Sequence, residues 1–317
     1  MSLYPEIEPY AHGMLNVGDG HLIYWECCGN SDGKPAVVLH GGPGSGCTPW
    51  HRRLFDPEVY KVVLFDQRNC GRSTPHASFL ETDLSANTTP HLAEDIERLR
   101  RHLNIEKWLV LGGSWGSVLA LAYAERFAGR ISEMVLFGVA TGRHSELDWL
   151  FRGGLSALFP VEWQRLKSYA GTKDDWEVVE RMRKLLNGPQ RFEAATEWCL
   201  WESATPHWPL GTELSPRFQD PDYAVAFARL VTHYVCHDTW LPEEGLPSSS
   251  EVLGAIPGVI VNGRMDFQSP LGNAWHLLNR WPGAEVRVVD NAGHAGSHEG
   301  ITKELVSALD RFTNKGD

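Results

Sequence analysis

The chain has 317 residues, of which 42% are hydrophobic and 22% are charged, and this balance is typical of a globular protein with a large core. Its net charge of −11 comes without a basic stripe, which excludes the usual mode of nucleic-acid binding. The N-terminus lacks a signal-peptide layout, and no apolar run approaches the roughly 20 residues that span a membrane. The six cysteines lack a disulfide spacing. We therefore expect a cytoplasmic protein with reduced thiols and no membrane partner.

The first 140 residues alternate between short apolar runs and helical patterns. Two runs at 14–17 and 21–27 flank the turn 18–20 and predict a hairpin. Strands that are buried on both faces have near-continuous apolar runs. Such runs, with the helical patterns between them, predict strands at 36–39, 62–65, 108–111 and 134–137 and helices at 89–103 and 115–126. Because strands and helices alternate, we expect an α/β fold with a mostly parallel sheet and helices on both faces.

The pattern changes between residues 141 and 250, where the chain becomes helical and aromatic. Alternation then returns, and it predicts strands at 259–261 and 285–289 and helices at 270–279 and 299–313. We therefore expect a core domain formed by residues 1–140 and 251–317, interrupted by a helical cap at 141–250. This cap would act as a lid over the strand ends, or its aromatic residues would simply build a small core of their own. Seven of the thirteen tryptophans lie in it: Trp149, Trp163, Trp176, Trp198, Trp201, Trp208 and Trp240.

The segment 112–116 reads Gly-Gly-Ser-Trp-Gly, which fits the pattern G-x-S-x-G directly after a predicted strand and directly before a predicted helix. In this setting the glycines permit a sharp turn that exposes the serine hydroxyl. The N-terminus of the following helix favours the negative charge that develops there. The motif therefore predicts a nucleophile at Ser114 in an α/β-hydrolase fold.

A serine hydroxyl needs a histidine base held by a carboxylate, and in this fold the chain order is Ser, Asp, His. Asp266 follows one predicted strand and His294 follows the last one, so both lie at the sheet edge where open α/β sheets place functional groups. We predict Ser114, Asp266 and His294 as the catalytic triad. Two neighbours are weighed against them: Asp290, otherwise a surface turn residue, and His298, otherwise a solvated loop histidine.

The reaction also needs backbone N–H donors for an oxyanion. One is expected from Trp115, the residue after the nucleophile. The second is expected from the glycine-rich loop 40–46 (HGGPGSG), whose glycines let backbone amides approach a substrate closely. A phosphate-binding loop is the rival interpretation, but the pattern G-x-x-x-x-G-K-[ST] is not satisfied.

One further cluster would suit a metal. His233 and His237 flank Cys236 at helical spacing. No clear additional ligand accompanies them, so helix packing is the preferred interpretation. We expect neither a metal nor another cofactor.

Four blocks of the sequence together resemble the proline iminopeptidase family of the α/β hydrolases. These blocks are 40–46 (HGGPGSG), 66–73 (DQRNCGRS), 112–123 (GGSWGSVLALAY) and the pair 263–266 with 293–294. With 87–89 and 95–100 they cover most of the chain outside the cap. In the second block, Asp66 and Arg68 are expected to support the oxyanion loop.

The resemblance implies an aminopeptidase that releases an N-terminal proline, or another small residue, from peptides through an acyl-enzyme. It implies the triad roles given above and adds Gly42 as the second oxyanion donor beside Trp115. Residues 198–202 (WCLWE) match the family's W-x-x-W-E, so Glu202 would bind the free amine of the substrate. The alternative role for Glu202 is that of a carboxylate on a helix surface.

The departures from the family pattern lie in the expected pocket. Val231 stands where the family has a second glutamate, and Ala140 stands where it often has an aromatic residue. Val235 and Phe151 also replace family aromatics. These changes leave open an esterase or amidase that acts on a different small acyl substrate. A non-catalytic binding protein of the same fold would not be expected to retain the triad residues and the glycine loop together.

Overall fold

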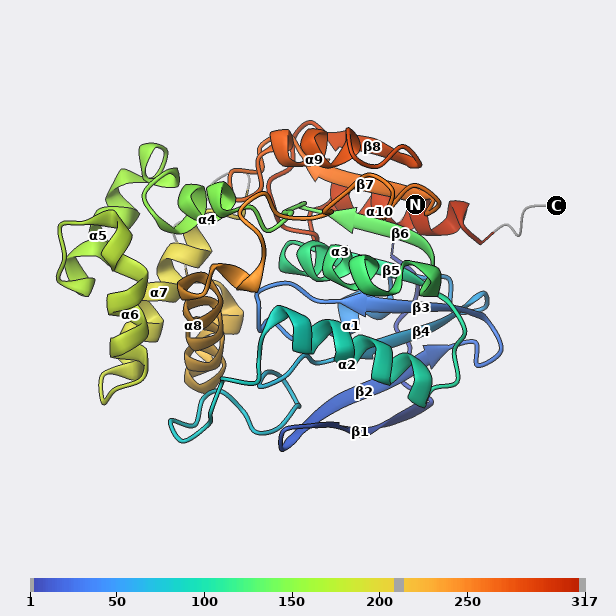
Figure 1. Ribbon diagram of the computed structural model, residues 1–317, viewed down its shortest axis with the longest axis horizontal. Helices are drawn as coiled ribbons and strands as arrows, with labels where there is room; N and C mark the ends of the chain where they lie inside the picture. The colour runs from blue at the N-terminus through green and yellow to red at the C-terminus, as the bar shows by residue number, and fades with distance from the viewer. Residues whose placement is uncertain (1–2, 208–213, 314–317) are drawn as a thin grey trace.

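The computed structural model describes residues 3–207 and 214–313, which form a twisted sheet with helices on both faces and further helices at one end (Figure 1). Two antiparallel pairings, β1 with β2 and β2 with β4, lie at one edge, and every other neighbouring pair is parallel. The predicted mostly parallel sheet is confirmed. Its eight strands lie in the order β1 (Ala11–Gly18), β2 (His21–Gly29), β4 (Tyr60–Phe65), β3 (Lys34–Leu39), β5 (Trp108–Gly113), β6 (Ile131–Phe137), β7 (Gly258–Gly263) and β8 (Ala284–Val289).

The burial of each strand follows its place in the sheet. Every residue of β5 and β7 is buried, because these strands have neighbours on both sides and helices on both faces. The edge strand β8 is only half-buried along its length. The predicted hairpin is present, and its turn uses positive φ angles at Gly18, Asp19 and Gly20.

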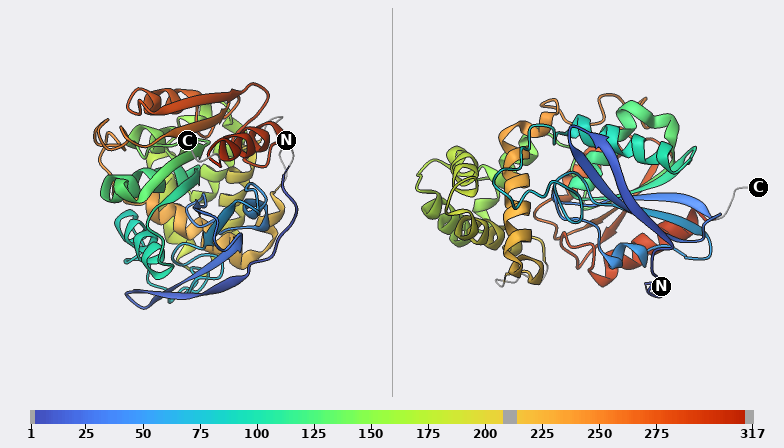
Figure 2. Two further views of the ribbon diagram at one scale, coloured as in Figure 1. Left: turned by 90° about the vertical axis from the view of Figure 1, so that its right-hand side faces the viewer. Right: turned by 90° about the horizontal axis from the view of Figure 1, so that it is seen from below.

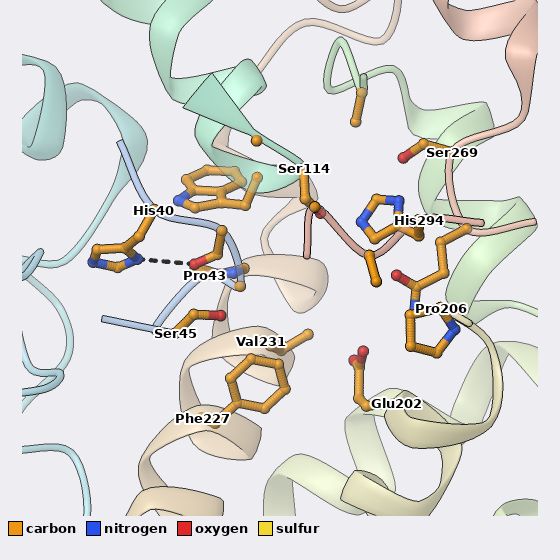
Figure 3. A pocket seen from close by; sticks show the side chains of 18 of the residues that line it. His40, Pro43, Ser45, Ser114, Glu202, Pro206, Phe227, Val231, Ser269 and His294 are labelled. Atoms are coloured by element: carbon orange, nitrogen blue, oxygen red, sulfur yellow. Dashed lines mark hydrogen bonds between the residues drawn. The ribbon is translucent and has the colours of Figure 1, made fainter. Parts of the chain in front are cut away.

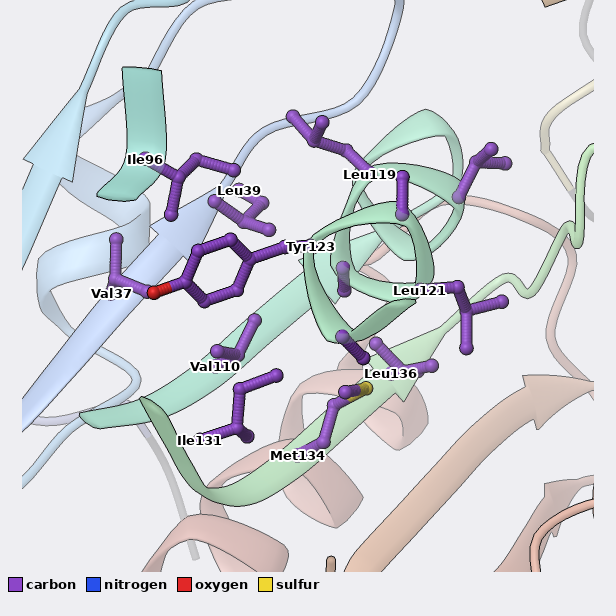
Figure 4. Packing of buried hydrophobic residues seen from close by; sticks show 14 of the residues in the cluster. Val37, Leu39, Ile96, Val110, Leu119, Leu121, Tyr123, Ile131, Met134 and Leu136 are labelled. Atoms are coloured by element: carbon purple, nitrogen blue, oxygen red, sulfur yellow. The ribbon is translucent and has the colours of Figure 1, made fainter. Parts of the chain in front are cut away.

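Helices cover the two faces of the sheet with separate hydrophobic clusters. The helices α2 (Thr89–His102), α3 (Trp115–Phe127) and α9 (Leu271–Leu278) share one cluster with the sheet. On the opposite face, α10 (Glu299–Arg311) and the short α1 (Pro49–Arg52) pack on a second cluster. Figure 4 shows Leu119, Leu121 and Tyr123 of α3 packed against β3, β5 and β6. The four-residue helix α1 was not predicted, since it is too short to show a helical period.

In the described part of the insertion between β6 and β7, five α-helices lie beyond the carboxyl ends of the parallel strands (Figures 1 and 2). They bury a third cluster that includes Trp163, Trp198 and Trp201. The inserted segment therefore has a core of its own and also faces the strand ends. Trp208 lies outside the described residues, and the domain boundaries near 140 and 250 stay a prediction. The helices are α4 (His144–Phe151), α5 (Pro160–Ala170), α6 (Val178–Leu186), α7 (Arg191–Ala204) and α8 (Pro221–Cys236).

All six cysteines have free thiols. Cys27 belongs to the cluster on one face of the sheet and Cys28 to the cluster on the other, so these adjacent side chains point in opposite directions. Over the described ranges, no helix has both the length and the apolar character needed to cross a membrane.

Candidate active site

Ser114 stands at the sharp turn between β5 and α3. Its φ and ψ of 55° and −123° lie in a region that L-residues rarely adopt. The strained turn is held by its own backbone, since Ser114 N donates to Phe137 O (2.9 Å) and Ser117 N donates to Ser114 O (2.8 Å). Backbone strain of this kind, held by surrounding structure, is concentrated at functional sites.

The glycines around Ser114 are required by close packing. A Cβ at Gly112 would collide with the carbonyl oxygen of Gly116, and a Cβ at Gly116 would collide with the carbonyl oxygen of Leu39. A Cβ at Gly113 would enter the ring of Phe137. The G-x-S-x-G pattern is therefore a packing requirement of the turn as well as a motif.

Asp266 and His294 meet at the carboxyl ends of β7 and β8. His294 Nδ1 lies 2.8 Å from Asp266 Oδ2, and Asp266 Oδ1 accepts a hydrogen bond from Ser269 N (2.7 Å). Asp266 is only 2% exposed. Burial lowers the pKa of His294, but the charge and the hydrogen bond of Asp266 raise it further, so the net pKa lies above the usual value. Figure 3 shows the Ser114 hydroxyl directed toward the His294 ring.

The two alternatives have other roles in the structure. Asp290 is exposed and forms an ion pair with Arg264 (2.6 Å). His298 caps α10, because its ring Nδ1 accepts a hydrogen bond from Gly300 N (3.2 Å). His298 is a loop residue, as expected, but it is half-buried rather than fully solvated. The cap needs an acceptor at the start of α10, and the His298 ring supplies it.

The segment after α7 holds the backbone of His294. The carbonyl oxygen of Pro206 accepts hydrogen bonds from His294 N (2.7 Å) and Ala295 N (3.1 Å). Beside it, Gln268 Nε2 donates to Thr205 Oγ1 (2.7 Å). The inserted helices are thus fastened directly to the loops that carry Asp266 and His294. No sequence signal indicates these contacts, since they join a backbone carbonyl to positions almost ninety residues away.

The glycine-rich loop after β3 is tied to the serine turn through Gln67. The Gln67 side chain donates to His40 O (2.9 Å) and accepts from Trp115 Nε1 (3.0 Å). His40 Nε2 accepts from Gln67 N (3.0 Å), while its Nδ1 contacts Gly41 O at 2.9 Å (Figure 3). Burial lowers the pKa of His40, which favours the neutral ring that this arrangement needs. The segments that carry Gly42 and Trp115 are therefore held in a fixed relation.

Asp66 and Arg68 have different roles, although both were expected to support the oxyanion loop. Asp66 does support it, because Asp66 Oδ1 accepts from Cys47 N at the end of that loop (2.8 Å). Arg68 instead pairs with Asp95 of α2 through Nε at 2.6 Å and Nη2 at 2.9 Å. It also donates to Val17 O of β1 (3.1 Å), so it fastens the antiparallel edge of the sheet to α2. The expectation for Arg68 was wrong because its long side chain reaches away from the loop.

Glu202 is buried and faces the cavity rather than the protein surface. It is 9% exposed, and its Oε1 has no hydrogen-bond partner among the described residues. Burial raises the pKa of Glu202 to about 7. Figure 3 shows its carboxylate pointing into the cavity between Val231 and Pro206. A buried carboxylate without a partner is costly unless a ligand supplies the missing charge.

A cavity of about 520 Å³ brings these groups together. Its lining includes Ser114, His294 and Glu202, and the loop that carries Gly42. The residues that depart from the family pattern also line it, and they give the cavity an apolar wall made of Ala140, Phe151, Val231 and Val235.

The side chains of His233, Cys236 and His237, which were weighed as possible metal ligands, make contacts within the protein instead. His233 Nε2 contacts Asn87 O (3.1 Å), and His237 Nδ1 contacts the carbonyl oxygen of His233 (2.7 Å). Cys236 Sγ contacts Glu180 Oε2 at 3.4 Å. Within the part of the chain that the structure describes, no group of three or more such side chains is placed to hold a metal ion.

Residues 34–301 match the α/β hydrolase fold family, so the protein is an α/β hydrolase. Over 324 aligned positions it is 48% identical to the probable proline iminopeptidase of Streptomyces coelicolor, covering 100% of this chain and 99% of that one. It is 41% identical to the proline iminopeptidase of Arabidopsis thaliana, covering 98% of this chain and 82% of that protein. The crystal structure of the Mycobacterium smegmatis proline iminopeptidase has the same fold, with a TM-score of 0.61 at 19% identity over 96% of this chain and 97% of that one.

The chain therefore belongs to the proline iminopeptidase family, and it is an enzyme of the hydrolase class. The family resemblance and the α/β-hydrolase fold predicted from the sequence are both confirmed.

Proposed function

We propose that the protein is a serine aminopeptidase that releases an N-terminal proline, or another small residue, from peptides. Membership of the proline iminopeptidase family supports this proposal. The observation that carries it is the position of Glu202, whose Oε1 has no hydrogen-bond partner among the described residues and whose carboxylate lines the same cavity as Ser114 and His294. An exopeptidase must detect the free ammonium of its substrate, and this carboxylate is placed to do so.

In the proposed mechanism, Ser114 attacks the carbonyl carbon of the first residue. His294 Nδ1 is held by Asp266, so Nε2 takes the proton from the Ser114 hydroxyl. The N–H groups of Gly42 and Trp115 stabilise the oxyanion. His294 then gives its proton to the departing amine, and the C–N bond breaks to leave an acyl-enzyme. Water, activated by the same histidine, releases the first residue and restores Ser114.

Glu202 would act in binding. An ammonium beside its carboxylate would supply the absent counter-charge and lower the pKa from about 7, so that the ion pair forms at neutral pH. Since Val231 is aliphatic, Glu202 would carry this interaction without a second glutamate at that position.

The test is a comparison of substrates on the purified protein. We expect hydrolysis of prolyl-naphthylamide, and of aminoacyl-naphthylamides with other small residues. The N-acetylated equivalents should react far more slowly, because they lack the ammonium. Rapid hydrolysis of simple esters, with no preference for a free amine, would overturn the proposal in favour of the esterase or amidase alternative.

We also propose a cytoplasmic location. The six free thiols support it, since reducing compartments keep cysteines unpaired. Fractionation of the source cells with an antibody against the protein tests this assignment, and recovery outside the cytoplasm would contradict it.

A further inference from the structure

Three charged side chains of the Asp, Glu, Lys and Arg types line the cavity within the described residues: Glu146, Glu202 and Arg217. The carboxylate of Glu146 is already occupied by partners within the protein. It accepts hydrogen bonds from Thr141 N (2.8 Å) and Gly142 N (3.0 Å), and it pairs with Arg143 (2.9 Å). Glu202 and Arg217 are therefore the two lining charges that are left for a ligand.

Arg217 lies in a short 3₁₀ turn, Pro216–Gln219, just before α8. Its guanidinium stacks over the rings of Phe218 at 4.6 Å and Phe227 at 5.4 Å. The structure gives it no ion pair with any described carboxylate. Stacking occupies the face of a guanidinium and leaves the N–H groups at its edge for planar anions such as a carboxylate.

The charge of Arg217 reaches Glu202 from a distance. Burial raises the pKa of Glu202, and the charge of Arg217 is the largest influence that opposes this rise. Arg217 also lowers the pKa of His207, after burial, at the same part of the cavity. Yet Arg217 and Glu202 do not form a direct ion pair. Among the described residues, the cavity thus holds one anion and one cation that have no ion-pair partner, in each other or elsewhere.

Separated opposite charges of this kind match a zwitterion, with an amine at one end and a carboxylate at the other. We propose that Arg217 binds the C-terminal carboxylate of the substrate, and that the enzyme prefers very short peptides with a free C-terminus, dipeptides and tripeptides. This inference rests on the proposed function, because it assumes that Glu202 binds the amine. Longer peptides would place their carboxylate beyond the reach of Arg217 and lose the interaction.

The experiment compares prolyl-glycine with its C-terminal amide, using the wild-type protein and Arg217→Gln. Arg217 is exposed, so the effect of one charge pair is moderate. In the wild type, kcat/KM should be higher for the acid than for the amide. In Arg217→Gln the ratio of the two should fall by about threefold to tenfold. The matched control is Arg191→Gln, since Arg191 stacks on Phe192 (4.3 Å) outside the cavity and should leave the ratio unchanged.

Prolyl-naphthylamide, which has a free amine and no carboxylate, separates the possible failures. If the wild type cleaves it but Arg217→Gln keeps the wild-type ratio of acid to amide, the carboxylate role of Arg217 is overturned and the proposed function stands. An equal loss on acid, amide and naphthylamide would assign Arg217 a structural role and also overturn the inference. A wild-type protein that does not cleave prolyl-naphthylamide would overturn both.

Discussion

The cavity has two walls of different character. The wall built from strand ends carries the polar groups proposed for chemistry, and the side chains that position them are already paired within the protein. Asp266 binds both His294 and Ser269, and Gln67 binds both His40 and Trp115. The wall built from inserted helices carries an aliphatic surface, together with an oxygen of Glu202 and the guanidinium of Arg217 that have no partner within the described part of the chain.

The difference suggests a division of roles: the strand ends hold groups in fixed positions, and the inserted helices present groups that can recognise a substrate. Groups that stabilise a transition state act best when neighbours hold them in place before the substrate arrives. Groups that recognise a charged substrate must remain unmatched until it binds, and a buried unmatched group reduces the stability of the free protein. The insertion therefore bears the cost of a buried unmatched carboxylate, whereas the strand ends bear the backbone strain of the Ser114 turn.

The largest effect is expected from a substitution in the wall built from strand ends. Ser114→Ala should reduce kcat for prolyl-naphthylamide on the order of 10⁴-fold or more, with an unchanged melting curve, because it removes the nucleophile and little else. Turnover and circular dichroism measure the two quantities. A fluorophosphonate should label Ser114 in the wild type, and labelling of another residue with activity retained in Ser114→Ala would refute the assignment.

The second largest effect is expected from a substitution in the wall built from inserted helices. Glu202→Gln should lower kcat/KM for free-amine substrates by roughly 30-fold or more, because it removes one partner of a desolvated charge pair. The loss on a small ester without an amine should be much smaller. Glu197→Gln is the control on the same helix, since Glu197 pairs with Arg165 outside the cavity (2.7 Å). Equal losses on amine and ester substrates would show that Glu202 only supports the helix.

A third measurement compares the two walls through the pH dependence of the free energy of unfolding. Burial raises the pKa of Glu202 from 4.5 to about 7, so the folded protein holds this proton more tightly than the unfolded chain does. The free energy of unfolding should therefore fall as the pH rises from about 4.5 to 7, by roughly 1–3 kcal/mol from this group. Glu202→Gln should remove that part of the decline. Urea denaturation of both proteins at pH 5 and pH 8, without substrate, tests it, and identical pH dependences would speak against a buried unpaired carboxylate.

The smallest expected effect concerns the second histidine of the last loop. His298→Ala removes the cap of α10 and should lower the free energy of unfolding by about 1 kcal/mol. Its kcat/KM should stay within about twofold of the wild type, because His298 does not line the cavity. A loss of activity as large as that of Ser114→Ala would move the base from His294 to His298.

The sequence predicted the strand-end wall well because its signals are local. Apolar runs marked β3, β4, β5 and β6, and the glycines at 112 and 116 marked the turn that exposes Ser114. Asp266 and His294 could be placed because each lies in the loop after a strand, and parallel strands bring their carboxyl ends to one edge.

The insertion was predicted less completely because its functional properties depend on distant packing. The burial of Glu202 arises where α5, α6 and α8 surround α7, and no local pattern records it. Arg217 has the sequence character of any surface arginine. Its proposed role rests on its stacking on the rings of Phe218 and Phe227 and on the cavity that it borders.

Besides lining the cavity, the insertion contacts the loop of the proposed base through the Pro206 carbonyl, and this contact bears on when that base is held in place. His294 N and Ala295 N both donate to that one oxygen, so the segment after α7 is joined directly to the loop of the proposed base. A swing of α7 away from the sheet would break both hydrogen bonds and release the backbone of His294. An enzyme whose entrance opened in this way would be idle while open. If the substrate entered by such a swing, its admission and the proton transfer by His294 would have to alternate.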